Sequence, residues 1–293
     1  MVDAIVDPRN PFLVLLWSFG LFLLMHAHQY LGALLAARAD HVSFDALMSG
    51  KHESSRSLLL RGSVAIAAGL PLIWLCSTLL WSRPTAWMGL GISWGWLLLG
   101  IGLGMVSPLL IIAVLWRMNL ARMPLSRLGL RRAELASAVV GISFAAVFAG
   151  VSEEIVFRGM MGLELALAWG WPAAILVSGA MFGIVHLLAQ MKALTLRKGA
   201  AIMVSSIAVS FMFISLYRFS GSLWLPIGFH IAWNYAHSVL LGLEMNGEAP
   251  LASCLRTTLD TTSWIAGGEA GMEASLPSVA WYLLLGLLFT LLR

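Results

Sequence analysis

Charged side chains are scarce in this chain of 293 residues: Asp, Glu, Lys and Arg make up 11% of it, while hydrophobic residues make up 60%. Soluble domains carry about 25% charged residues, so the composition excludes an ordinary soluble protein. The apolar runs are too long for strands and do not alternate with polar residues, which favours transmembrane helices over a β-barrel. The net charge of +4 comes without a basic stripe interleaved with aromatic residues, so no nucleic-acid partner is expected.

Cysteine is scarce as well, and a common zinc-protease motif is missing. Cys76 and Cys254 are far apart and form no CxxC pair, which argues against a disulfide framework and against a thiolate metal site. The sequence has no HExxH, the motif in which two histidines on one helix face bind zinc. We therefore expect no metal and no cofactor. A zinc site built from two histidines and a glutamate that are distant in sequence stays open as the alternative.

Hydropathy predicts an all-α fold, a polytopic transmembrane bundle of about eight helices in a single integral membrane domain over residues 1–293. Each predicted span reaches or approaches the ~20 residues that a helix needs to cross a bilayer. The third span carries Gly100, Gly102 and Gly104, small residues that let neighbouring helices approach closely. The predicted spans cover residues 11–37, 58–81, 86–116, 134–158 or 134–169, 172–190, 200–217, 223–244 and 277–292.

A polar loop of about residues 245–276 separates the last two predicted spans. Its length and its content of Gly, Ser and Thr favour a solvated linker, with a mobile lid over a substrate entrance as the alternative. Its acidic residues are Glu248, Asp260, Glu269 and Glu273. The short polytopic chain without appended domains is typical of a bacterial inner (cytoplasmic) membrane protein, and the lipid bilayer is its expected environment.

The fourth predicted span contains two adjacent glutamates and an arginine, Glu153, Glu154 and Arg158. A charge at the centre of a membrane helix costs roughly 2.5–3.5 kcal/mol on insertion scales, so three together need a reason. On a helix, Glu154 and Arg158 are four residues apart and share a face, where they can neutralise each other. Glu153 is turned about 100° away from that pair. We therefore interpret Glu154 and Arg158 as structural and Glu153 as the candidate for chemistry.

Further polar residues fall inside later spans. His186 lies in the fifth span, and His230 and Asn234 lie four apart on one face of the seventh, with His237 one turn further along. Counted from the span midpoints at ~1.5 Å per residue, Glu153, His186 and His230 lie within roughly 10 Å of mid-membrane depth. The sequence therefore predicts a catalytic cavity within the membrane. Taken alone, His186 would be a buried histidine and Asn234 a contact between helices; His237 stays open between cavity lining and packing.

Such a cavity can support general acid–base chemistry on water. A carboxylate in an apolar site has a raised proton affinity, which suits a general base near neutral pH. A histidine beside it can share the proton and hold the water. A second histidine with an asparagine amide supplies two hydrogen-bond donors of the kind that stabilise an oxyanion. Base, orienting group and anion stabiliser are the parts required for amide hydrolysis.

These residues resemble the three motifs of a known family. Glu153-Glu154-x-x-x-Arg158, then Phe182-x-x-x-His186, then His230-x-x-x-Asn234, in that order and over about residues 130–245, are similar to the CPBP family, the CAAX-prenyl-protease-like or Abi intramembrane glutamic endopeptidases. The resemblance implies that Glu153 activates the hydrolytic water with help from His186. It implies that His230 and Asn234 form the oxyanion site, and that Glu154 and Arg158 support the catalytic helix.

The predicted function is therefore hydrolysis of a peptide bond in a membrane-anchored protein or peptide, such as removal of a C-terminal anchor tag or maturation of a secreted peptide. Three alternatives stay open. A zinc-dependent membrane protease would use the same histidines and glutamate as metal ligands. A transporter would use intramembrane Glu and His as a proton relay, although no inverted repeat of broken helices is evident. A non-catalytic immunity or scaffold protein would use the fold to bind a peptide.

Overall fold

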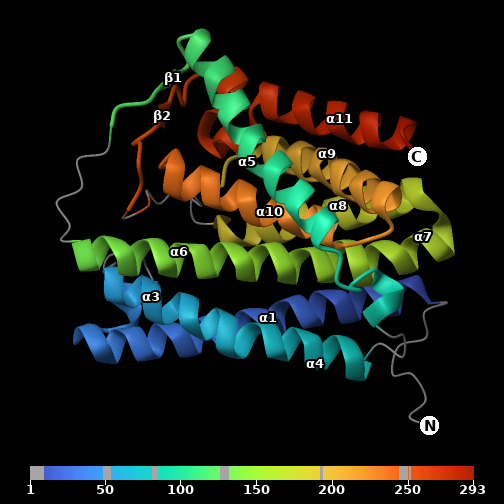
Figure 1. Cartoon of the computed structure of the whole chain (residues 1–293), viewed down its shortest axis with the longest axis horizontal. Helices are drawn as coiled ribbons and strands as arrows, with labels where there is room; N and C mark the ends of the chain where they lie inside the picture. Colours follow the sequence, from blue (N-terminus) through green and yellow to red (C-terminus); the bar gives the residue numbers. More distant parts are fainter. Residues whose placement is uncertain are drawn as a thin grey trace.

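The computed structural model describes residues 10–48, 54–80, 85–125, 132–191, 194–243, 250 and 252–293. These residues form a bundle of helices with one short pair of strands (Figure 1). The α-helices are α1 (Pro11–Asp40), α2 (Phe44–Met48), α3 (Ser55–Val64), α4 (Leu70–Leu80), α5 (Trp94–Arg117), α6 (Arg132–Glu153), α7 (Leu163–Trp169), α8 (Trp171–Ala189), α9 (Leu196–Ser220), α10 (Trp224–Tyr235) and α11 (Leu276–Leu291).

Wider and tighter helical turns connect some of these helices. The π-helical turns are η1 (Ala65–Gly69), η3 (Glu154–Gly162) and η5 (Ala236–Leu240), and the 3₁₀ turns are η2 (Thr85–Met88), η6 (Trp264–Ala266), η7 (Gly268–Ala270) and η8 (Met272–Ala274). Strands β1 (Ala121–Arg122) and β2 (Thr258–Leu259) pair antiparallel. The fold is the all-α membrane bundle that the hydropathy predicts.

Among the described residues, five helices are long and apolar enough to cross a membrane. They match the second to sixth predicted spans and cover Ser55–Leu75, Trp94–Arg117, Ala133–Trp169, Trp171–Ala189 and Leu196–Ser220. The fourth predicted span does continue to Trp169, because α6, η3 and α7 follow one another without a break. The first, seventh and eighth predicted spans correspond to α1, to α10 with η5, and to α11, which has 16 residues.

The predicted start of the third span at residue 86 is wrong, because α5 begins only at Trp94. The preceding residues form the separate turn η2, which Gly89 ends with φ +70°, a left-handed conformation that glycine adopts without strain. The carbonyl of Gly89 accepts hydrogen bonds from the backbone N–H of Leu223 at 3.2 Å and from the hydroxyl of Ser222 at 3.1 Å. These bonds attach the turn to the connection between α9 and α10.

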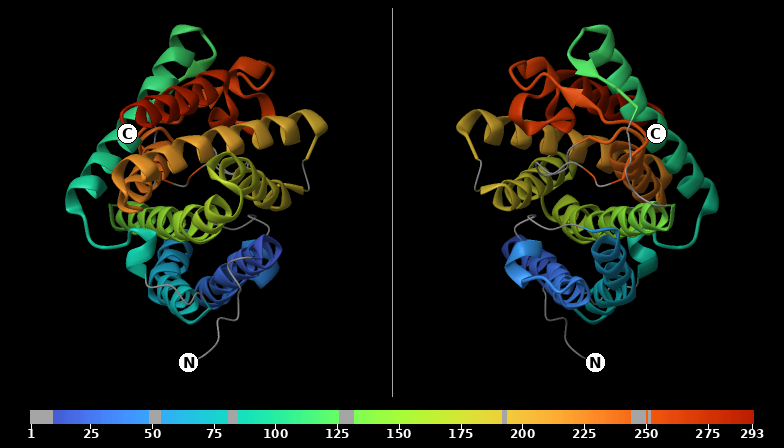
Figure 2. Two further views of the ribbon diagram at one scale, coloured as in Figure 1. Left: turned by 90° about the vertical axis from the view of Figure 1, so that its right-hand side faces the viewer. Right: turned by 90° about the vertical axis from the view of Figure 1, so that its left-hand side faces the viewer.

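The helices stack in layers, and α6 lies in the middle (Figures 1 and 2). On one side of α6 lie α1, α3 and α4; on the other lie α8, α9 and α10, with α11 beyond them. Helix α5 crosses this stack at a steep angle and packs along α10. The long helix α6 therefore has a helix layer on each face, which places Glu153 and Glu154 at its end inside the bundle.

Close contact between α5 and α10 depends on glycine, as the sequence predicts. A methyl group on Gly100 would collide with the backbone oxygen of Leu225, and one on Gly104 with the backbone oxygen of Phe229. Gly102 faces open space instead. Small residues thus bring the backbones of α5 and α10 together without intervening side chains. The contact fixes the position of α10, which carries His230.

The polar loop is not a solvated linker over the residues that the structure describes, which exclude Glu248. Backbone N–H groups of Cys254, Leu255 and Thr257 bond to carbonyls at the end of η5, and β2 pairs with β1. Further on, Met272 is buried, and its carbonyl accepts a hydrogen bond of 2.6 Å from Ser278. Tertiary hydrogen bonds therefore order this segment despite its linker-like composition.

Candidate active site

One buried carboxylate, Glu154, holds together two motif residues from different helices. Its Oε1 accepts a hydrogen bond of 2.9 Å from Nη1 of Arg158 and lies 2.8 Å from Nδ1 of His230. The carboxylate side chain and that of Arg158 are both fully buried. Since a carboxylate oxygen beside a guanidinium can only accept, Nδ1 of His230 carries the proton in this contact. The contact therefore fixes the tautomer and the orientation of the imidazole.

Arg158 is enclosed by groups from two further helices. Its Nη2 donates a hydrogen bond of 3.1 Å to the hydroxyl of Ser210 on α9. Its guanidinium carbon lies 4.6 Å from the ring centre of Phe182 and 4.8 Å from that of Phe213, in the geometry of cation–π contacts. We call the group formed by Glu154, Arg158, Ser210 and His230 the clamp. It joins η3, α9 and α10 through charge-assisted hydrogen bonds.

Glu153 points away from the Glu154–Arg158 pair, as its position on the helix predicts, and lines a cavity of about 530 Å³. Its Oε2 lies 3.8 Å from Nε2 of His230. This separation is too long for a direct hydrogen bond but suits a bridging molecule. The two adjacent glutamates therefore differ: Oε1 of Glu154 contacts two protein groups, Arg158 and His230, and Glu153 faces the cavity.

The same cavity brings together the other candidate residues, His186, His230, Asn234 and His237. His186 uses Nδ1 to contact the carbonyl of Phe182 at 2.8 Å, so Nδ1 is the donor and Nε2 keeps its lone pair. Asn234 is buried one turn after His230 on α10. His237 lines the cavity too, so of its two open interpretations, cavity lining and packing, the structure favours cavity lining.

Several cavity or clamp residues carry no signal in the sequence. Ser210 is one of many serines in apolar helices, and Phe213 is one of many aromatic residues there. The polar loop contributes Glu269 and Glu273 to the cavity wall, and α3 contributes Arg61. Only packing reveals these residues, because their helices and loop are distant from the motifs along the chain.

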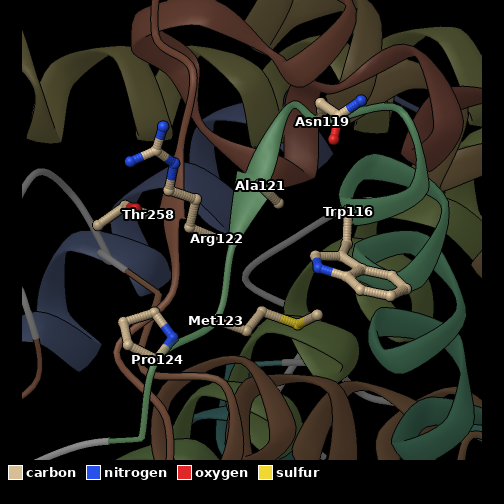
Figure 3. Close-up of a pocket in the computed structure, with 7 residues that line it drawn as sticks. All are labelled: Trp116, Asn119, Ala121, Arg122, Met123, Pro124 and Thr258. Atoms are coloured by element: carbon tan, nitrogen blue, oxygen red, sulfur yellow. The ribbon is translucent and has the colours of Figure 1, made fainter.

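A second hollow lies at the end of α5, beside the two strands (Figure 3). Its walls include Trp116, Asn119 and Arg122 on one segment and Thr258 on β2. Among the described residues of its lining, Arg122 is the one ionisable group, and no motif residue contributes to it. It offers no pair of groups for acid–base chemistry.

Within the part of the chain that the structure describes, no three His, Cys, Asp or Glu side chains converge as a metal site requires. His230 lies near both glutamates, at 2.8 Å from Glu154 and 3.8 Å from Glu153, while Nδ1 of His186 contacts the carbonyl of Phe182.

Comparison with known proteins bears on this region of the chain. Residues 135–236 match the family described as Type II CAAX prenyl endopeptidase Rce1-like. The matched segment runs from α6 to the start of η5 and contains every motif residue named above. Neither the curated proteins nor the solved structures give a match to the chain.

Proposed function

Starting from the match of residues 135–236 to the Rce1-like family of CAAX-type endopeptidases, we propose that the chain is an intramembrane endopeptidase of the glutamic type. The observation that carries this proposal is the contrast between the two adjacent glutamates. Glu154 is fixed by the clamp, while Glu153 faces the cavity 3.8 Å from His230. A carboxylate left accessible beside an oriented histidine is the arrangement that a general base needs.

In this mechanism Glu153 takes a proton from a water molecule, and the hydroxide attacks the carbonyl carbon of the scissile peptide bond. His186 assists by accepting a hydrogen bond from the water at Nε2, the ring nitrogen that its contact with Phe182 leaves available. The tetrahedral intermediate then collapses, the C–N bond breaks, and the proton held by Glu153 passes to the leaving nitrogen. General acid–base catalysis of this kind contributes typically 10²–10⁴-fold in rate.

His230 and Asn234 are proposed to stabilise the oxyanion that forms at the carbonyl oxygen. Because Nδ1 of His230 donates to Glu154, Nε2 is the nitrogen that faces the cavity. When the imidazole is protonated, the carboxylate of Glu154 stabilises the positive charge, and Nε2 becomes a donor. The amide of Asn234 lies one turn further along α10 and supplies the second donor.

The substrate class we propose is a membrane-anchored protein or peptide, processed at a C-terminal anchor tag or in a secreted precursor. The apolar helices support a bilayer environment for the cavity, where such substrates reside. The cavity is lined by both polar and apolar side chains, as expected for a site that accepts a peptide backbone within an apolar bundle.

The test is cleavage of membrane-anchored peptides by the purified full chain in lipid vesicles, read by product mass. We expect wild type to cut with EDTA present, and Glu153→Gln to lower the rate about 10²–10⁴-fold. Glu134→Gln is the matched control, because it makes the same change near the start of α6, away from the cavity. Loss of cleavage with EDTA and its recovery with zinc would overturn the glutamic mechanism in favour of a zinc protease. If the Glu153→Gln variant keeps the biological effect of the wild-type protein, this result would favour the non-catalytic scaffold protein over the protease.

A further inference from the structure

The cavity has an acidic edge that the proposed chemistry does not use. Residues 269–274 of the polar loop form part of its wall, and two of them, Glu269 and Glu273, are exposed carboxylates. We call residues 269–274 the mouth. Both glutamates lie on the cavity that also contains Glu153, so a peptide in the cavity would pass close to them.

The two carboxylates are held in place although they are exposed. Oε1 of Glu273 accepts a hydrogen bond of 3.1 Å from Nε1 of Trp233 on α10, and its backbone carbonyl accepts one of 2.6 Å from Ser205 on α9. Oε2 of Glu269 accepts a hydrogen bond of 3.3 Å from Thr195, at the start of α9. Bonds to two different helices fix the mouth against the bundle.

A buried histidine lies beside these carboxylates, and one of its ring nitrogens has no hydrogen-bond partner among the described residues. His237 is 3% exposed and lines the same cavity, one turn after Trp233. Its Nδ1 has no hydrogen-bond partner among the described residues, and Glu273 lies near enough to interact with it electrostatically. An unpaired polar atom in a buried site is costly, so it points to a ligand that would satisfy it. A ring nitrogen with a lone pair accepts from an ammonium or a guanidinium.

The charges around the cavity favour a cation at the mouth. Three carboxylates line it, those of Glu153, Glu269 and Glu273, and the one Lys or Arg in the described lining is Arg61. Helix α3, which carries Arg61, lies on the opposite side of α6 from the loop (Figures 1 and 2). Among the described residues, neither glutamate of the mouth forms an ion pair with lysine or arginine.

We propose that Glu269, Glu273 and His237 form a specificity subsite for a lysine or arginine side chain of the substrate. The carboxylates attract the cation, and Nδ1 of His237 accepts one of its hydrogens. This inference rests on the proposed protease function, since it assumes that a peptide occupies the cavity. It goes further by assigning the charge of the residue that the enzyme selects near its cleavage site.

The experiment measures binding and cleavage separately, with the full chain in vesicles of neutral phosphatidylcholine. The probes are three fluorescent peptides with one apolar anchor segment, followed by two lysines, two alanines or two glutamates. We expect the lysine peptide to bind more tightly than the alanine peptide, and the glutamate peptide to bind least. In the double variant Glu269→Gln/Glu273→Gln, we expect the lysine peptide to bind about two- to thirtyfold more weakly, because each exposed ion pair contributes about 1.4- to fivefold.

Two further variants separate charge from structure. Asp260→Asn removes one negative charge from an exposed position of the same loop that does not line the cavity, and should leave the lysine preference intact. Trp233→Phe removes the hydrogen bond to Glu273 but keeps its charge. A loss of preference in Trp233→Phe equal to that in the double variant would show that the glutamates only hold the loop, and would overturn the subsite.

Equal binding of the lysine and alanine peptides to wild type would also overturn the subsite. The outcome for the proposed function is independent of this result. Cleavage that depends on Glu153 without a lysine preference keeps the protease and removes the subsite. A lysine preference in binding that disappears in the double variant, without cleavage of any peptide, supports the subsite and counts against the protease.

Discussion

The clamp and the mouth are two acidic regions of one molecule, and their carboxylates differ in burial and in the groups that they contact. In the clamp, Glu154 is fully buried and contacts both Arg158 and His230 through one oxygen. At the mouth, Glu269 and Glu273 are exposed and are held by neutral donors alone among the described residues. A buried charge needs an oppositely charged or hydrogen-bonding partner, whereas an exposed carboxylate is solvated and stays available to a ligand. The clamp therefore fixes the orientation of the His230 imidazole, and the carboxylates of the mouth stay accessible to a ligand.

Breaking the clamp should have the largest effect on stability. Arg158→Leu removes the guanidinium and leaves the carboxylate of Glu154 buried with His230 as its remaining hydrogen-bond partner. Removing one partner of a buried pair costs about 3–5 kcal/mol, so we expect a loss of that order in the free energy of unfolding. Denaturant titration in detergent micelles measures it. The control is Arg122→Leu at an exposed position on β1, and an equally small effect of both changes would contradict the role of the clamp.

Moving α10 should disturb both regions at once, because this helix carries His230 of the clamp and Trp233 that bonds to the mouth. Gly104→Ala places a methyl group against the backbone of Phe229 and pushes α10 away from α5. Overpacking of this kind costs about 1–3 kcal/mol, and we expect the cleavage rate to fall with it.

Gly102→Ala is the control for this change, because Gly102 lies on the same helix with open space beside it. Replacing an exposed helix glycine by alanine should stabilise the protein by roughly 0.5–1 kcal/mol. Opposite signs for the two substitutions, read by thermal unfolding, are the expected result. The same sign for both would show that α10 does not depend on the close contact.

Loosening the mouth should have the smallest effect. Trp233→Phe removes one hydrogen bond to Glu273 and keeps an aromatic ring in the packing, so we expect a loss of about 1 kcal/mol or less in global stability. Hydrogen exchange of the backbone amides in residues 264–275 should become faster, while exchange in α6 stays unchanged. Faster exchange in both regions would mean that the mouth and the clamp are not independent.

The sequence predicts the clamp's central pair because a spacing of four residues is a local property of helices. Glu154 and Arg158 meet as this spacing requires, and Glu153 points elsewhere. The contact of His230 with Glu154 is not predicted, since the resemblance assigns this histidine to the oxyanion site and says nothing of its other nitrogen. Such a contact depends on how α10 is rotated against α6, which no local pattern encodes.

The site residues that the sequence does not predict were missed for one common reason: their local sequence does not differ from that of residues without such contacts. Serines in apolar helices commonly bond to the preceding turn of their own helix, as Ser143 does to the carbonyl of Val139, so nothing marks Ser210 as a partner of Arg158. A loop rich in Gly, Ser and Thr has the same composition whether water or the protein surrounds it. The order of residues 252–275 comes from hydrogen bonds to distant segments, which only the folded chain reveals.

The unbroken run from α6 through η3 to α7 has a consequence for the surrounding lipid. Its 37 residues, Ala133–Trp169, would span about 55 Å at the rise of an α-helix, against about 30 Å for the hydrocarbon layer. Tilts of membrane helices reach about 40°, which still leaves this run longer than the layer is thick. The run therefore projects into the headgroup region, bends, or is surrounded by thickened lipid. The immersion depth of Glu153 is thus a joint property of the protein and of the acyl chains that surround it.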